Sequence, residues 1–316
     1  MTMASLQHAD PAAGAPTRGA TVRPAFVRRG WWLPYALLAP SIVFLVLFTY
    51  LPIVRVAVDA LREVPHAGGP SRFVGLANFS AVLGDPAFIK AATNNLIYAV
   101  GTVVPTILLA LLFALAVRRS NAFTAVLRVV LFFPSLVPLV AAASLFFFIF
   151  LPHLGLLDHY LRMVGLRGPN WLGDSDVALW SIMGITVWKN AGYYMLFYIA
   201  GLQNVPRDTI EAAMIDGANG LQRLWYVLLP ALAPTTAFVV VIALVNVLTS
   251  VDHVVVLTRG GPTNATNLVL YYIFQEAHEN FNYGKAAAAT LMSVAVLLAI
   301  SLGSVRAMER GGRGVA

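Results

Sequence analysis

Apolar residues gather in six long stretches of the chain, and polar segments separate them. Each stretch is near the ~20 residues that a helix needs to cross the hydrocarbon core of a bilayer. Inside a membrane only helices and closed barrels satisfy the backbone, and the strict alternation of a barrel strand is absent here. The pattern therefore predicts an all-α integral membrane protein with six transmembrane helices. The expected spans are residues 31–53, 96–117, 129–151, 177–202, 232–257 and 286–305.

The composition agrees with a membrane protein and excludes several kinds of site. Of the 316 residues, 59% are hydrophobic and only 11% are charged, which is unlike a soluble domain. Cysteine is absent, so disulfides, thiol nucleophiles and cysteine-based metal sites are excluded. A net charge of +7 would suggest a nucleic-acid partner for a soluble protein. In a protein surrounded by lipid, the placement of that charge reports topology instead, and we expect no nucleic-acid partner.

Basic residues near the ends of the spans predict the orientation. Segment 1–30 is rich in Ala, Pro and Gly, so we expect a disordered cytoplasmic tail before the transmembrane domain of residues 31–305. The first span lacks a small-residue cleavage site and is interpreted as an anchor. Loops on the opposite side balance their basic residues with acids, so both termini, including the tail 306–316, are expected in the cytosol. The expected cytosolic arginines are Arg18, Arg23, Arg28, Arg29, Arg118, Arg119, Arg128, Arg207, Arg223, Arg306, Arg310 and Arg313.

The segment 203–230 is polar, lies between the fourth and fifth spans, and falls in the cytosol by the same argument. Its Glu-Ala-Ala run favours a helix that Asp216 and Gly217 end or bend, and a second helical run stops against Pro230. We therefore expect two short helices with a hinge. Small residues leave room for a partner to approach the backbone, and an apolar face suits docking. That face is predicted to comprise Leu224, Trp225, Val227 and Leu228.

The spacing Glu211-Ala212-Ala213, three residues, Gly217, then Leu229-Pro230 closely resembles the "EAA" signature of inner-membrane subunits of binding-protein-dependent ABC importers. The run Leu257-Thr258-Arg259-Gly260-Gly261-Pro262 after the fifth span resembles an outer loop of the sugar-type branch of these permeases. His278 departs from that branch, in which an aromatic residue is expected. The resemblance extends over nearly everything from the first span to the sixth.

The resemblance implies a type I ABC importer permease of the bacterial inner membrane, with the EAA segment as a coupling helix in a cleft of an ATPase subunit. It implies as partners a second homologous permease chain, two ATPase subunits and a periplasmic solute-binding protein. The chain then forms half of a path for a sugar, a polyol or a sugar-like solute such as glycerol 3-phosphate. The predicted ATPase-coupling residues are Glu211, Ala212, Ala213, Asp216, Gly217 and Leu224. A separate set of predicted site residues lies in the outer loop and comprises Gly260, Gly261 and Pro262.

Polar residues within the spans are few. Lys189 lies near the middle of the fourth span, where a charge costs at least ~2.5 kcal/mol, so it must face protein or water. Two polar stripes are expected to line a translocation path, and in maltose-type permeases the sugar contacts fall on these stretches. Interhelical hydrogen bonding explains the same residues equally well. The stripes are Thr186, Lys189, Asn190 and Tyr193 on the fourth span and Asn246, Thr249 and Ser250 on the fifth.

Elsewhere, two outer asparagines, Asn78 and Asn94, are suited to cap helix starts. No GxxxxGK[ST] phosphate loop is present, so the chain is not expected to hydrolyse ATP itself. A GxSxG elbow and an HExxH pair are also absent. His153 and His159 flank Asp158 at a spacing that matches no familiar metal-ligand set, and solvated loop histidines are expected there. We assign no catalytic residue, metal or cofactor.

Two alternatives come from other functional classes. A self-contained secondary transporter would use Lys189 and Asp252 as an ion relay, but it predicts inverted repeats that the sequence does not show. An intramembrane enzyme would need a nucleophile and a base in the core, and none stands out. For the solute itself, an ammonium at Lys189 suits sugar hydroxyls or a phosphate, so the sequence favours a neutral saccharide or polyol first and glycerol 3-phosphate second.

Overall fold

The computed structural model describes residues 33–63, 70–118 and 121–312, so the predicted tail 1–30 lies outside the described residues. The chain divides into two units, residues 1–52 and 53–316. The first contains α1 (Leu33–Leu45) and the π-helical turn η2 (Val46–Tyr50), which lead into α2 (Leu51–Ala60). The stretch Leu33–Ala60 is long and apolar enough to cross a membrane. The predicted first span therefore begins where expected but continues to residue 60.

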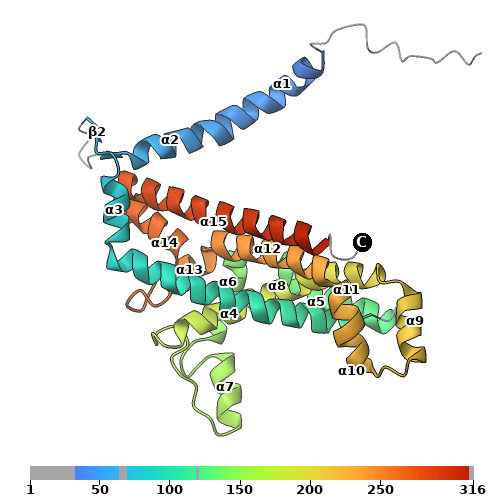
Figure 1. The fold of residues 1–316 in the computed structure, drawn as a ribbon. Helices are drawn as coiled ribbons and strands as arrows, with labels where there is room; N and C mark the ends of the chain where they lie inside the picture. Colours follow the sequence, from blue (N-terminus) through green and yellow to red (C-terminus); the bar gives the residue numbers. More distant parts are fainter. Residues whose placement is uncertain (1–32, 64–69, 119–120, 313–316) are drawn as a thin grey trace, which may run out of the picture. The chain divides into compact units, whose positions relative to one another are not determined.

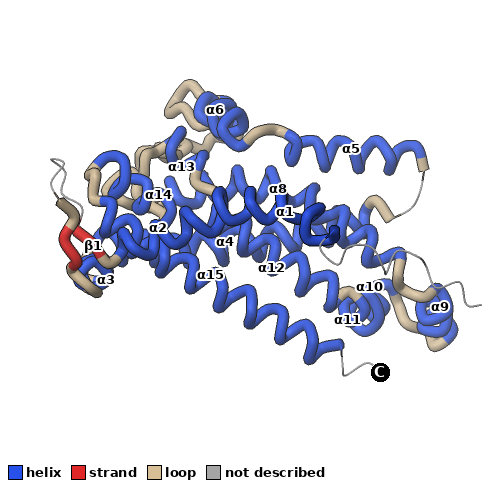
Figure 2. Tube along the Cα trace, turned by 90° about the horizontal axis from the view of Figure 1, so that it is seen from above, coloured by secondary structure: helices blue, strands red, loops and turns tan. Residues whose placement is uncertain are grey.

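Long helices form the frame of the second unit. Helix α4 contacts α8 and α12, and α12 also contacts α15, so these helices run side by side (Figures 1 and 2). They lie between an end that carries α3 and α14, called here the α14 end, and an end that carries α9, called the α9 end. The frame helices are α4 (Pro86–Ala116), α8 (Ala178–Gln203), α12 (Ala233–Thr249) and α15 (Tyr283–Gly312).

Shorter elements complete the second unit. A two-stranded antiparallel ribbon and a short helix connect α2 to α4. The predicted C-terminal tail begins inside α15, which continues to Gly312. The remaining elements are β1 (Arg62–Glu63), β2 (Arg72–Phe73), α3 (Ala77–Leu83), α5 (Ala122–Leu136), α6 (Leu139–Ile149), α7 (Leu156–Met163), α9 (Arg207–Ile215), α10 (Gly220–Arg223), η3 (Leu224–Leu228), α11 (Leu229–Ala231), α13 (Asp252–Leu257), α14 (Val269–Phe274) and η4 (Gln275–Glu279).

Two of the predicted spans are broken. The third divides into α5 and α6, whose axes meet at 97°, because Pro138 has no N–H with which to continue the helix. The fifth divides at Ser250 and Val251, where the backbone of Ser250 turns extended between α12 and α13. The outer halves of the two broken spans, α6 and α13, pack against each other. The sequence predicts a continuous helix for both spans. The structure corrects this for the third span, whereas Ala233–Leu257 still forms one candidate span with a local interruption.

Among the described residues, four helices are long and apolar enough to cross a membrane, or five if the bent pair α5 and α6 counts as one span. Helix α8 is outside this set although it has 26 residues, enough to reach ~39 Å at 1.5 Å per residue. It carries polar side chains through its middle, and it is also the helix that packs most extensively inside the unit.

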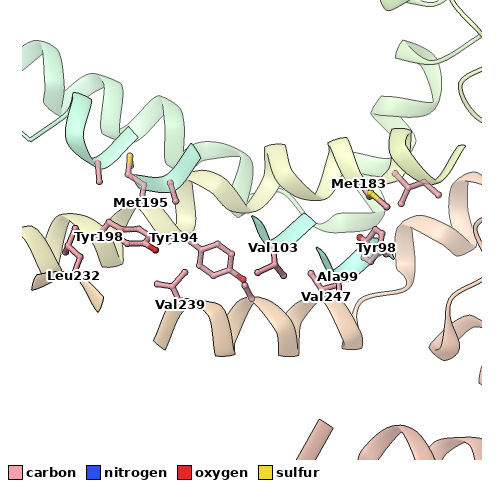
Figure 3. Close-up of a cluster of buried hydrophobic side chains, with 14 of the residues drawn as sticks. Tyr98, Ala99, Val103, Met183, Tyr194, Met195, Tyr198, Leu232, Val239 and Val247 are labelled. Carbon is pink, nitrogen blue, oxygen red and sulfur yellow. The ribbon is translucent and has the colours of Figure 1, made fainter. Parts of the chain in front are cut away.

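The main core lies where α8 meets α4 and α12. Figure 3 shows Tyr194 and Tyr198 of α8 lying between that helix and Val239 and Leu232 on the other side, all of them buried. A smaller cluster forms the α14 end, where Ala287, Ala288 and Ala289 of α15 pack against Val82, Phe88 and Tyr272. The small-residue run that opens the sixth span thus permits the close helix packing that the sequence predicts.

Candidate functional site

The segment 203–230 folds as the two short helices that its sequence predicts. Pro206 precedes α9, and the Glu-Ala-Ala run lies inside that helix. Gly217 ends it at φ +79°, a left-handed conformation that favours glycine. The N–H of Gly217 donates to Met214 O at 3.1 Å and the N–H of Ala218 to Ala213 O at 2.9 Å, a Schellman motif. The last carbonyls of α9 are therefore bonded within the segment.

The second short helix begins with its own cap. The Asn219 side chain accepts from Gln222 N at 2.9 Å, while the Gln222 side chain accepts from Asn219 N at 2.8 Å, a reciprocal capping box. Helix α10 then continues through η3 and α11 into α12. Among the described residues, the side-chain hydrogen bonds of residues 207–230 all stay within the segment. The caps and turns of its backbone are therefore satisfied locally, while Ile210, Leu224 and Leu228 anchor it to the main core.

One face of the segment packs inward and the other faces out. Leu228 is buried, and Leu224 is half-buried against the main core cluster. Leu228 therefore does not belong to an exposed docking face, contrary to the prediction. Leu224 packs inward and anchors the segment to the main core. The exposed apolar side chains are Ile215 at 87%, Leu221 at 65%, Trp225 at 61% and Tyr226 at 80%. Glu211, Ala212, Asp216 and Gly217 are also exposed and Ala213 is half-buried. Apart from Leu224, the predicted coupling residues share this outward surface with the four apolar side chains.

The polar stripe on α8 is built into the helix bundle. Thr186 Oγ1 lies 2.5 Å from the hydroxyl of Tyr98 on α4, and that hydroxyl lies 2.7 Å from Nε2 of His253 on α13. His253 is fully buried, and its Nδ1 has no hydrogen-bond partner. Three helices are joined through this chain of polar atoms. Buried polar groups of this kind tie helices together in a medium without water.

Lys189, one turn further along α8, contacts the break between α5 and α6. Its Nζ donates to the carbonyl oxygens of Ser135 at 3.0 Å and Val137 at 2.5 Å. The side chain is half-buried. It faces protein, as the cost of a charge at membrane depth requires.

The other residues predicted for the path are held separately. Asn190 donates to Thr186 O on its own helix, and Tyr193 stacks edge-on against Phe197. On α12, Asn246 donates to the hydroxyl of Tyr194 at 2.9 Å, and Thr249 bonds Val245 O on its own helix. Ser250 lies at the break after α12. In the described part of the chain, no hydrogen bond joins the stripe on α8 to the stripe on α12. Their role in a solute path stays a prediction.

The outer loop forms a compact turn against α4. Gly260 has φ +77°, and a Cβ there would lie 2.8 Å from the ring of Tyr271. Thr266 Oγ1 donates to Gly261 O at 2.6 Å, and Pro262 O accepts from Ala265 N at 2.8 Å. Asn94 donates from α4 to Asn264 O at 2.8 Å and Asn267 O at 3.0 Å. The loop is thus clamped onto the bundle.

Neither outer asparagine caps a helix start, so that expectation is wrong. Asn94 lies inside α4 and serves the loop instead. Asn78 lies in the first turn of α3 and donates to Ala60 O and Arg62 O, both at 2.9 Å. Each side chain satisfies carbonyls in segments remote in sequence, which a search for local capping signals does not detect.

A charged cluster joins α4, α14 and α15 at the α14 end, and we call it the clasp. It comprises Asp85, Tyr272, Glu276 and Lys285. Asp85 accepts from Lys285 Nζ at 2.5 Å and from the Tyr272 hydroxyl at 2.8 Å, and it caps α4 through Ala87 N. Lys285 Nζ also lies 3.6 Å from Glu276 Oε1. These contacts fix the starts of two frame helices to each other.

The clasp shifts the titration of two of its members. Burial alone would raise the pKa of Asp85, but the hydrogen bonds from Lys285, Tyr272 and Ala87 outweigh it and lower that pKa. Burial raises the pKa of Tyr272, and the neighbouring carboxylate of Asp85 raises it further. Both shifts favour a charged carboxylate beside a neutral phenol.

The loop around Asp158 has a structural role. Its carboxylate accepts from Trp171 Nε1 and from His153 N, both at 2.8 Å, and these bonds hold its pKa below the ordinary value. His153 and His159 are both exposed, as predicted, but only His153 lies in a loop, since His159 is part of α7. Trp171 is thereby bonded to α7 through its indole nitrogen.

Sequence reasoning missed Tyr98, His253 and the clasp. Tyr98 and His253 are 155 residues apart, and Asp85 and Lys285 are 200 apart, so no local spacing reveals either contact. A charge at the start of a span was the available signal for Asp85 and Lys285. It was used for topology alone.

Comparison with known proteins identifies the family to which this chain belongs. The pattern of the family described as "Binding-protein-dependent transport system inner membrane component" matches residues 106–313. The sn-glycerol-3-phosphate transport system permease protein UgpA of Agrobacterium fabrum is 34% identical over 279 residues, which cover 88% of this chain and 95% of that protein. The probable ABC transporter permease protein YurN of Bacillus subtilis is 32% identical over 88% of this chain and 97% of its own length.

A solved structure has the same fold. One chain of a bacterial ABC transporter involved in the import of the acidic polysaccharide alginate superposes with a TM-score of 0.77, at 23% identity, over 88% of this chain and 96% of its own. The superposition agrees with the helix bundle described above, and the family match covers residues 106–313 of it. The chain belongs to the family of inner-membrane components of binding-protein-dependent transport systems, which are the permease subunits of ABC importers.

Proposed function

We propose that this permease forms half of the translocation path for a sugar or sugar-like solute and is driven by an ATPase subunit docked on the segment 203–230. The observation that carries the proposal is the outward face of that segment. Its backbone is capped locally by the Schellman motif and the capping box, yet Ile215 and Tyr226 are almost fully exposed. Local order combined with exposed apolar side chains is typical of a preformed docking surface.

The proposed topology has six spans with both termini in the cytosol. Helix α8 counts as the fourth span, because Thr186 and Lys189 are bonded inside the bundle and so do not expose polarity to lipid. The bent pair α5 and α6 counts as the third. The distribution of arginine supports the orientation, which puts the α9 end in the cytosol and the α14 end outside. Fusing a reporter enzyme that is active in only one compartment to loop 203–206 and to loop 164–170 tests it.

The proposed assembly contains a second homologous permease, two ATPase subunits and a periplasmic solute-binding protein in the bacterial inner membrane. The family is defined by dependence on a binding protein, which supports that partner. A self-contained secondary transporter has no support, because Asp252 is exposed and, in the part of the chain that the structure describes, no bond links it to Lys189. Reconstitution in liposomes tests the assembly: uptake should need ATP and all partners. Uptake by this chain alone on an ion gradient would contradict it.

The solute is proposed at the level of a class. From sequence alone a neutral saccharide or polyol comes first, while the names of relatives such as UgpA support sn-glycerol 3-phosphate. Lys189 does not decide between them, because two backbone carbonyls occupy its ammonium. A ligand screen on the cognate binding protein decides, since a bound ligand raises its melting temperature. If phosphate esters raise this melting temperature and sugars do not, glycerol 3-phosphate replaces the neutral saccharide or polyol as the first choice of solute.

A further inference from the structure

The bend between α5 and α6 exposes backbone carbonyls at membrane depth. Helix α5 ends at Leu136 and α6 begins at Leu139. Ser135 O and Val137 O accept no backbone N–H across the bend. Irregular backbone inside a membrane is tolerated only where its polar groups are satisfied by protein or by water in a cavity. These two oxygens therefore need a donor.

Lys189 supplies that donor from a different helix. Its ammonium carries three N–H groups and bonds both oxygens, at 3.0 Å and 2.5 Å. The last carbonyls of a helix also form the negative end of its dipole, so a cation gains more there than a neutral donor would. The charge at Lys189 and the orphan carbonyls of α5 thus offset each other's cost of burial.

The contact is held in place by close packing nearby. At Gly192, less than one turn from Lys189, α5 approaches so closely that a Cβ would lie 1.8 Å from Leu131 O. This approach fixes the distance between α5 and α8 within reach of the lysine side chain. Beyond the bend, α6 packs against α13. The orientation of the bend consequently determines where α6 meets the other broken span.

We propose that Lys189 is a positioning residue that sets the α5–α6 bend and, through it, the packing of α6 on α13. The contacts of Lys189 with the bend lie entirely within this chain, so this role goes beyond the proposed path and does not require contact between Lys189 and solute. It predicts that loss of the ammonium changes the geometry of the resting transporter.

The chain contains no cysteine, so two can be introduced for spin labels without background from this subunit, and the chain is labelled before it is assembled with its partners. Val126→Cys on α5 and Phe148→Cys on α6 are suitable, because these side chains are 62% and 67% exposed. Pulsed EPR on the assembled transporter without solute then reports the distance across the bend. We expect one narrow distribution for the parent, a shifted or broadened one for Lys189→Met, and recovery in Lys189→Arg. Thr93→Ala on α4 is the matched control, because that exposed hydroxyl bonds only Ile89 O on its own helix.

Transport kinetics provide the second readout. A positioning role lowers the maximal transport rate of Lys189→Met several-fold, while the half-saturating concentration of loaded binding protein stays unchanged. If Lys189→Met fails to assemble, Lys189→Gln, which keeps an amide donor, is measured instead and should show an intermediate distribution. A Lys189→Met distribution that superposes on the parent's overturns the proposal, and so does failure of Lys189→Arg to recover it. Because ATP-dependent uptake by the parent is measured in the same preparation, failure of the proposed function would be seen separately.

Discussion

In the clasp, hydrogen bonds join residues that are remote in sequence, whereas in segment 203–230 they join near neighbours. Asp85 and Lys285 are separated by 200 residues, while Asn219 and Gln222 are three apart. The clasp covers its polar groups with residues of the same chain. The segment keeps its backbone in order and leaves its apolar side chains uncovered. The difference indicates that the clasp is satisfied within this chain, whereas segment 203–230 presents a surface for the partner proposed above.

The largest effect should come from placing a charge on the exposed apolar surface of segment 203–230, called here the uncovered surface. Its residues are Ile215, Leu221, Trp225 and Tyr226. Ile215→Asp should lower coupled transport more than about tenfold, because burying an unpaired carboxylate in a docking interface costs well over 1.4 kcal/mol. Copurification of the ATPase subunit and ATP-dependent uptake measure it. Leu154→Asp is the matched control, since Leu154 is 85% exposed against 87% for Ile215 but lies far from the segment. Equal transport by both variants would remove the docking surface from the proposal.

The next largest effect should be a loss of stability when the clasp is broken. Lys285→Met leaves the carboxylates of Asp85 and Glu276 facing each other without a cation, which should destabilise the chain by about 2 kcal/mol. We expect a lower melting temperature of the purified transporter and unchanged ATPase copurification. Lys90→Met is the control, because Lys90 is exposed on the same face of the bilayer and has no ion pair among the described residues. Loss of ATPase binding in Lys285→Met would contradict the separation of the clasp, which stabilises the chain, from segment 203–230, which binds the ATPase.

Some of this contrast was readable from the sequence. The coupling segment was predicted in detail because its signals are local: Gly217 ends a helix, Pro230 stops another, and both act on their immediate neighbours. Leu228 was assigned to the wrong face because side-chain direction in the π-helical turn η3 depends on packing. Lys189 was recognised as costly, but its carbonyl partners were not. They become available only because the span breaks at Pro138, and sequence hydropathy showed a continuous apolar stretch there.

The clasp should also respond to acid. The folded-state pKa of Asp85 lies below its unfolded value of about 4, so its stabilising contribution is complete above that value. The contribution is lost as the pH falls through the lowered pKa. Melting temperatures measured from pH 6 down to about pH 3 should therefore fall more steeply for the parent than for Asp85→Asn, which cannot titrate. Parallel curves would show that Asp85 gains nothing from Lys285 and Tyr272.

The smallest effect should come from Gly217→Ala at the end of α9. Its comparison with Gly217→Trp separates backbone strain from side-chain bulk. A Cβ at Gly217 would meet nothing within 4 Å, so Gly217→Ala introduces no clash and only the cost of a left-handed backbone at φ +79°, about 1 kcal/mol. Coupled transport should fall by up to about fivefold. Gly220→Ala, equally open but at the start of a right-handed helix, should transport normally. Gly217→Trp carries the same strain and adds a large group to the uncovered surface, so it should block transport while expression stays unchanged. If the alanine and tryptophan variants transport equally, backbone strain alone accounts for the glycine, and no partner approaches the chain at that point.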